Sequence, residues 1–106
     1  FSTTGVQQQS SPGATSFALD QNYPNPFNST TVIAYSLPYK SRVTLTIFNM
    51  LGKKVRTLVN ETKVAGKYSV VWDGKDDSGE NLSAGLYLIR LKTSNGTITK
   101  KALLVR

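Results

Sequence analysis

The stretch TVIAYSLPYKSRVTLTIFN, residues 31–49, decides the fold class. Its apolar side chains recur at every second position, at Ile33, Tyr35, Leu37, Val43, Leu45 and Ile47. A period of two places such side chains on one face of an extended strand. Pro38 cannot donate a hydrogen bond to a sheet, so it ends the first strand, and residues 38–41 form a hairpin connection. The stretch therefore predicts two antiparallel strands that each bury one face.

The same alternation continues along most of the chain. Short segments rich in β-branched and aromatic residues are separated by Gly, Pro, Asn and Asp, without a sustained helical period. Further strands are expected over residues 17–21, 54–59, 67–72, 86–93 and 97–105. About seven strands joined by short turns predict an all-β, immunoglobulin-like antiparallel β-sandwich. Its expected core consists of the inward-facing side chains Ile33, Tyr35, Val43, Leu45, Ile47, Tyr68, Val70, Trp72, Tyr87, Ile89 and Leu91.

The N-terminal segment differs from the rest in composition. Residues 1–16 are rich in Ser, Thr, Gln, Gly and Pro, which is typical of a flexible linker or tail. They lack an initiator Met and the basic and apolar regions of a signal peptide, so we expect an excised or processed part of a longer protein. Residues 17–106 are expected to form one domain, and no apolar stretch approaches the roughly 20 residues that span a bilayer.

The composition excludes most enzyme chemistry. The absence of Cys and His removes disulfides, thiolate nucleophiles, imidazole bases and the metal sites that need these side chains. We therefore expect neither enzymatic activity nor a cofactor. Thirteen Lys and Arg against six Asp and Glu give a net charge of +7. No nucleic-acid-binding motif or basic helix accompanies this charge, so a nucleic-acid partner is not expected.

The acidic stretch DGKDDSGEN, residues 73–81, has two interpretations. Several carboxylates on one loop are what calcium prefers. However, Lys75 occupies a ligand position of the EF-hand order and Gly79 comes one residue late. The spacing favours a turn whose carboxylates accept hydrogen bonds from backbone N–H groups.

A proline-rich stretch, LDQNYPNPFNSTTVIAYSLP, precedes and includes the first long strand. Pro24 and Pro26 fix their own φ and keep the residues before them out of the helical region. Asn25 and Asn28 suit turns that the side chain closes by a local hydrogen bond. The segment is therefore expected to be extended or turn-like and to lie at the margin of a sheet.

This stretch resembles the opening signature of type IX secretion C-terminal sorting domains (type A, Por-type), which begin Leu-x-Gln-Asn-Tyr-Pro-Asn-Pro-Phe-Asn. Further matches follow in order and end at the basic and apolar terminus KKALLVR, so the resemblance covers residues 17–106. The matched motif residues are Asn22, Pro24, Asn25, Pro26, Gly52, Gly66, Tyr68, Trp72, Asp73, Gly74, Gly85, Tyr87 and Arg90. Sorting domains of this type are in turn similar in fold to the Ig-like domain of flagellar hook-capping proteins.

The resemblance implies a non-catalytic signal that directs an exported protein from the periplasm through the outer membrane, to the surface or the medium of a Gram-negative bacterium. The implied partners are the outer-membrane translocon, its shuttle proteins, a sortase-like peptidase that removes the domain, and an upstream cargo. The domain would be a substrate of that peptidase and would itself perform no chemistry.

The end of the last expected strand is apolar on both of its faces, which a half-buried strand does not need. One interpretation is that a loop covers the outer face. The other is a strip that a partner recognises, formed by Lys100, Lys101, Leu103, Val105 and Arg106. The strand could also pair with the sheet edge of a partner.

Two alternatives to the sorting role remain at this point. The N-terminal tail could pair with the sheet edge of a neighbouring copy and so build a structural assembly. The domain could also be an accessory module that binds carbohydrate, provided that exposed aromatic side chains line up on one face. The candidates for such a platform are Tyr23, Phe27, Tyr39 and Phe48.

Overall fold

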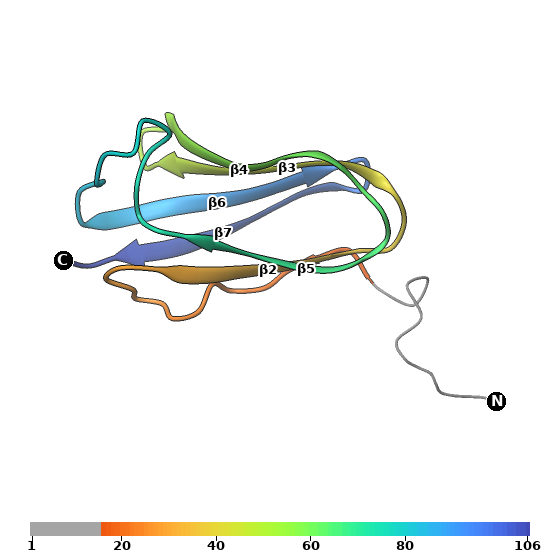
Figure 1. Ribbon diagram of the computed structural model, residues 1–106, viewed down its shortest axis with the longest axis horizontal. Helices are drawn as coiled ribbons and strands as arrows, with labels where there is room; N and C mark the ends of the chain where they lie inside the picture. The colour runs from red at the N-terminus through yellow and green to blue at the C-terminus, as the bar shows by residue number, and fades with distance from the viewer. Residues whose placement is uncertain (1–15) are drawn as a thin grey trace.

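Two antiparallel sheets face each other in the computed structural model, which describes residues 16–106 (Figure 1). One sheet has the order β1 (Ala18–Leu19), β2 (Thr31–Leu37), β5 (Gly66–Trp72). The other has the order β4 (Lys54–Lys63), β3 (Ser41–Asn49), β6 (Gly85–Thr93), β7 (Gly96–Leu104). The immunoglobulin-like sandwich predicted from the sequence is thereby confirmed. The hairpin expected at residues 38–41 was wrong, because β2 and β3 do not pair and the turn between them crosses from one sheet to the other. Residues 1–15, and with them nearly all of the predicted linker or tail, lie outside the described residues.

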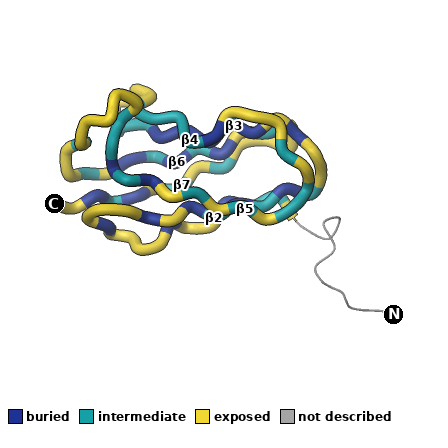
Figure 2. The backbone as a smooth tube through the Cα atoms, in the orientation of Figure 1, coloured by how far each residue is buried: buried dark blue, intermediate teal, exposed yellow. Residues whose placement is uncertain are grey.

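The core lies between the sheets, where alternate residues of the strands meet (Figure 2). All the side chains expected there are buried except Tyr68 and Val70, which are half-buried on β5. They are less covered because β5 is an edge strand of the smaller sheet. The core also contains side chains that the expected set lacked, namely Leu19, Phe27, Leu37, Val59, Ala102 and Leu104.

Strand β4 is four residues longer than expected. The sequence predicted it to end at Val59, but pairing with β3 continues to the register Ser41↔Lys63. Three of the four additional residues are exposed, because they belong to an edge strand and extend the sheet without adding to the core. Apolar alternation cannot detect such residues, since it reports burial and not pairing.

Among the described residues there is no helix long and apolar enough to cross a membrane. The C-terminus lies at the same end of the sandwich as the β5–β6 connection (Figure 1). The candidate site is built at this end.

Candidate functional site

The proline-rich segment lies along the outer edge of β7, so the two most distinctive parts of the sequence are neighbours in space. The amide N–H of Phe27 donates to the carbonyl of Leu103 (3.0 Å), and the N–H of Val105 donates to the carbonyl of Phe27 (2.8 Å). The Asn25 side-chain oxygen accepts from the N–H of Leu103 (2.9 Å). The Gln21 amide donates to the Lys101 carbonyl (2.7 Å). We call residues 21–27 the edge segment.

A buried polar network holds the edge segment in this position. Asn22 is 2 % exposed, and its amide donates to the hydroxyl of Thr31 (2.9 Å) and to the carbonyl of Pro24 (3.3 Å). The Thr31 hydroxyl donates to the same carbonyl (2.8 Å). Because Thr31 begins β2, the network fixes the segment to the smaller sheet while its other bonds reach β7 of the larger one. Buried polar groups that are satisfied in this way specify one arrangement.

Three aromatic side chains pack together and join the edge segment to the core. The ring of Phe27 lies 5.3 Å from that of Trp72, and the Trp72 ring lies 5.7 Å from that of Tyr87 in an edge-on arrangement. The indole N–H of Trp72 donates to the carbonyl of Lys75 (3.1 Å). The three rings come from the edge segment, β5 and β6, so they connect both sheets at this end.

Arg106 attaches the chain end to the β5–β6 connection. Its guanidinium donates to the carbonyls of Leu82 (2.8 Å) and Gly74 (3.1 Å). Gly74 has φ +70°, and a Cβ placed there would lie 3.2 Å from the Arg106 guanidinium. Gly74 therefore provides both the backbone conformation and the space that this contact needs.

We expect Gly74→Ala to lower the free energy of unfolding by more than Gly79→Ala. Gly79 also has a positive φ (+88°), but a Cβ there meets nothing within 4 Å. Both variants incur roughly 1–2 kcal/mol for a left-handed backbone. Only Gly74→Ala also displaces the Arg106 side chain. Urea titration of the two variants measures the difference, and equal losses would show that the crowding at Gly74 is unimportant.

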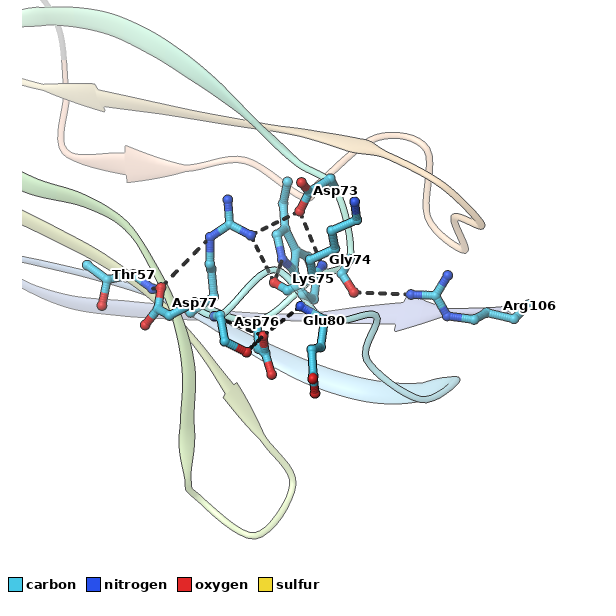
Figure 3. A network of polar contacts seen from close by, with 11 residues as sticks. Thr57, Asp73, Gly74, Lys75, Asp76, Asp77, Glu80 and Arg106 are labelled. Carbon is cyan, nitrogen blue, oxygen red and sulfur yellow. Dashed lines mark hydrogen bonds and ion pairs between the residues drawn. The ribbon is translucent and has the colours of Figure 1, made fainter.

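The aspartates of the acidic loop accept hydrogen bonds within the protein, as the turn interpretation predicted (Figure 3). Asp76 accepts from the hydroxyl and N–H of Ser78 and from the N–H of Glu80. Asp77 accepts from the N–H of Thr57 on β4. Within residues 16–106 no three acidic side chains are grouped so that they could hold a metal ion.

The electrostatics of the loop follow from these bonds. Burial alone would raise the pKa of Asp73, but hydrogen bonds from the Lys75 N–H and from Arg56 outweigh this effect and lower it. The Arg56 guanidinium lies 3.0 Å from the Asp73 carboxylate. The Ser78 hydroxyl, followed by the Glu80 N–H, lowers the pKa of Asp76. The loop is thus a stabilised turn that also bonds to the edge of β4 at residues 55–57, where the N–H of Asp77 donates to the carbonyl of Val55.

The predicted recognition strip is divided between the two faces of β7. Lys101 and Val105 are exposed on the outer face, Val105 to 41 %, and Leu103 is half-buried beside them. Lys100 lies half-buried on the opposite, core-facing side. Arg106 is exposed, although its guanidinium is held by the two carbonyls described above. The outer edge of residues 101–105 is already paired with the edge segment, so pairing with a partner strand there would first require that segment to leave.

Two of the matched motifs serve the same structural purpose. In Ala65-Gly66-Lys67-Tyr68 and in Ala84-Gly85-Leu86-Tyr87, the tyrosine hydroxyl donates to the carbonyl four residues earlier, at Val64 (2.7 Å) and Ser83 (2.6 Å). Each bond closes the turn that begins a strand, β5 in one case and β6 in the other. Burial raises the pKa of Tyr87, and the nearby charge of Arg106 acts in the opposite direction. Gly52 lies in the exposed β3–β4 turn.

The aromatic platform considered for carbohydrate binding is not formed. Phe27 is only 2 % exposed, because it packs on Trp72 beneath the edge segment. Tyr23 is exposed next to Val32 near the start of β2, whereas Tyr39 lies in the turn after the end of that strand. Phe48 is on the other sheet, under Arg90. Aromatic side chains in three separate places cannot line one binding face.

The sequence alone did not reveal that the edge segment pairs with β7, or that Arg106 binds Gly74. The sequence partly indicated the pairing of the edge segment, since its two prolines required a position at a sheet margin. No local pattern indicates which margin, because the paired residues are far apart in the chain.

Comparisons with known proteins give a consistent family. The model of the FlgD Ig-like domain family matches residues 25–97. The basal-body rod modification protein FlgD of Salmonella typhimurium is 35% identical over 86 residues, which is 80% of this chain and 37% of that protein. The same protein of Salmonella typhi matches equally well. The chain thus spans little more than a third of the length of these relatives.

Three solved structures share the fold. FlgD from P. aeruginosa has 30% identity and a TM-score of 0.55, covering 70% of this chain and 58% of that one. FlgD from Xanthomonas campestris, whose structure concerns hook capping in flagellar assembly, has 20% identity and a TM-score of 0.53, covering 86% and 67%. Dimeric latent PorU from Porphyromonas gingivalis has 18% identity and a TM-score of 0.65, covering 96% and 10%. The last two, at such identity, show the fold alone.

Proposed function

The chain belongs to the FlgD Ig-like domain family, and within that fold we propose, from its motif resemblance to sorting domains, that residues 17–106 are a non-catalytic sorting module of type IX secretion. In this role the folded domain carries an upstream protein through the outer membrane to the cell surface or the medium of a Gram-negative bacterium. Residues 1–16 would connect the module to its cargo.

One observation supports this proposal more than any other. The two stretches on which the resemblance to sorting domains mainly rests, the Asn-Tyr-Pro-Asn-Pro-Phe opening and the basic and apolar terminus, bind each other along β7. Phe27, Trp72 and Gly74 join them, since the ring of Phe27 packs on Trp72 and the Gly74 carbonyl accepts from Arg106. Motif residues that are distant in sequence thus build one end of the domain.

This geometry suggests how a secretion partner distinguishes folded from unfolded substrates. The terminal strand is in place only when the edge segment, β6 and the β5–β6 connection are all assembled around it. The outward side chains Lys101, Leu103 and Val105, together with Arg106, would be the surface that the translocon, a shuttle protein or a sortase-like peptidase contacts. In this proposal Lys100 supports the strand from its inner side and is not part of the contact.

Deleting residues 100–106 would be a poor test, because it removes Ala102 and Leu104 from the core. We instead propose the double variant Lys101→Glu/Val105→Ser, which changes outward side chains alone. Its matched control is Lys67→Glu/Val71→Ser, since Lys67 and Val71 are also an exposed lysine and an exposed valine, on the smaller sheet. Both variants are fused behind an exported fluorescent protein in a type IX-competent cell.

The β7 variant is expected to reduce delivery to the surface or medium by about tenfold or more, as loss of contacts at the centre of an interface does. The control is expected to be delivered like the unmodified domain. Thermal unfolding of both purified variants verifies that they fold. Equal delivery by the two folded variants would show that the outer face of β7 is not the recognition surface.

A second candidate function is a part of a flagellar hook cap. The 35% identity to a basal-body rod modification protein favours it, although the chain corresponds to only 37% of that protein. Replacing the matching domain of the Salmonella protein by residues 17–106 tests this candidate directly. Restored motility would support a hook-capping role, and a non-motile strain with normal amounts of the chimera would argue against it.

A further inference from the structure

The outer face of the larger sheet carries several cations. Strand alternation places Val43, Leu45, Ile47, Ile89 and Leu91 in the core, fully buried, so that their neighbours point outward. The outward residues pair across β3, β6 and β7 in rows such as Thr46–Arg90–Thr99 and Phe48–Leu88–Lys101. The cations at the outward positions of β3, β6 and β7 are Arg42, Arg90, Lys92 and Lys101.

No carboxylate accompanies these cations on the outward positions of β3, β6 and β7. Four of the six acidic residues of the chain belong to the loop 73–81, and the other two are Asp20 and Glu61. The three ion pairs among the described residues join Arg56 to Asp73 and Asp77, and Lys63 to Glu61. The part of the face that β3, β6 and β7 form is therefore positively charged without internal compensation.

Arg90 is the central cation of this face and has an unused donor. Its guanidinium carbon lies 4.5 Å from the centre of the Phe48 ring, so the group stacks on that ring. Its Nε is buried and, among the described residues, has no hydrogen-bond acceptor. An unsatisfied buried donor is uncommon and costly in folded proteins. Because Nε is enclosed, an acceptor from outside can reach this guanidinium only through its Nη groups, which are not enclosed and have no hydrogen-bond partner among the described residues.

A groove opens beside this guanidinium. It has a volume of about 290 Å³ and is lined by Phe48, Gly52, Leu88, Arg90 and Thr99. Its lining combines an aromatic ring and a leucine with one fixed guanidinium. A planar guanidinium held on an aromatic ring suits bidentate binding of a carboxylate.

We propose that this groove is a docking site for an acidic segment of a partner protein, which inserts a glutamate or aspartate against Arg90. The methylene part of that side chain packs on Phe48 and Leu88, and the surrounding cations Arg42, Lys92 and Lys101 attract further acidic residues. Lys101 lies on the same outer face as the surface proposed for sorting, but the inference rests on Arg90 and its groove and does not depend on the sorting role.

An anionic membrane is the less suitable occupant. Proteins that lie on membranes insert protruding aromatic or aliphatic side chains below the headgroups. Here Phe48 and Leu88 are half-buried, and Phe48 lies beneath a guanidinium. The apolar surface is thus recessed in a groove that one side chain can enter, which favours a protein segment.

Titration of the ¹⁵N-labelled chain with an acetylated peptide of alternating glutamate and leucine tests the proposal. The Nη–H signals of the Arg90 guanidinium are expected to shift and their exchange with water to slow, because these donors gain an acceptor. Arg90→Gln is expected to weaken peptide binding by about tenfold or more, as loss of a charged hydrogen-bond pair does. Arg90→Lys keeps the positive charge but loses the planar pair of donors that binds a carboxylate, so it is expected to weaken peptide binding by several-fold.

Lys67→Gln removes the same charge from the outer face of the smaller sheet and is the matched control. It is expected to bind the peptide as the unmodified chain does. Equal weakening by Lys67→Gln and Arg90→Gln would reduce the effect to net charge and overturn the proposal. Binding of the chain to phosphatidylglycerol vesicles, with no shift of the Arg90 signal by the peptide, would also overturn the proposal.

Discussion

Trp72→Ala is expected to lower the free energy of unfolding by about 3–5 kcal/mol, in the range that buried aromatic truncations show. Trp72 is fully buried and contacts the rings of both Phe27 and Tyr87, so its removal leaves a cavity where the two sheets and the edge segment meet. The total free energy of unfolding of a small domain is about 5–15 kcal/mol. The variant should therefore lose a large fraction of the stability of the domain, as urea titration with circular dichroism would show.

Val71→Ala is the control for this prediction. Val71 is the neighbouring residue on the same strand, but its side chain points outward and is 56% exposed. We expect its truncation to cost well under 1 kcal/mol, as for most surface substitutions. A Trp72→Ala variant as stable as Val71→Ala would contradict the central position that we assign to the indole.

Phe27→Ala is expected to release the edge segment from β7 as well as to destabilise the domain by about 3–5 kcal/mol. The N–H of Leu103 donates to Asn25 and the N–H of Val105 donates to Phe27, so both amides depend on the segment. Without the Phe27 ring, hydrogen exchange at these two amides should accelerate more than exchange elsewhere in the larger sheet, because local opening precedes global unfolding.

Leu45→Ala provides the comparison for that exchange experiment. Leu45 is fully buried on β3 and belongs to neither β7 nor the edge segment. Its truncation should raise exchange across the sheet through global unfolding, without a selective effect at Leu103 and Val105. If the two variants gave the same exchange pattern, the edge segment would not be the element that protects β7.

The strands could be predicted from sequence because their burial follows a period of two. Ile33, Tyr35, Val43, Leu45 and Ile47 are all buried as this period requires. The same reasoning ended β4 too early, since residues 60–63 pair with β3 while remaining mostly exposed. Pairing at a sheet edge needs backbone groups and no apolar side chain, so it leaves little trace in the sequence.

The candidate site was predictable in its parts and not in its assembly. The prolines at 24 and 26 indicated a sheet margin, and the apolar end of the chain indicated either a covering loop or a recognition strip. The pairing of the proline-containing edge segment with β7 depends on contacts between residues about eighty positions apart in the chain. Arg90 was recognised as a motif residue, but its stacking on Phe48 follows from the pairing of β3 with β6.

The most direct test of the sorting role compares two strains of one bacterium. An exported fluorescent protein that ends in residues 1–106 is produced in a type IX-competent strain and in its translocon-deficient derivative. We predict fluorescence at the surface or in the medium of the first strain and retention in the periplasm of the second. Retention of the folded fusion in both strains, or equal release from both, would contradict the sorting role, while the docking site at Arg90 would still be open to its own test.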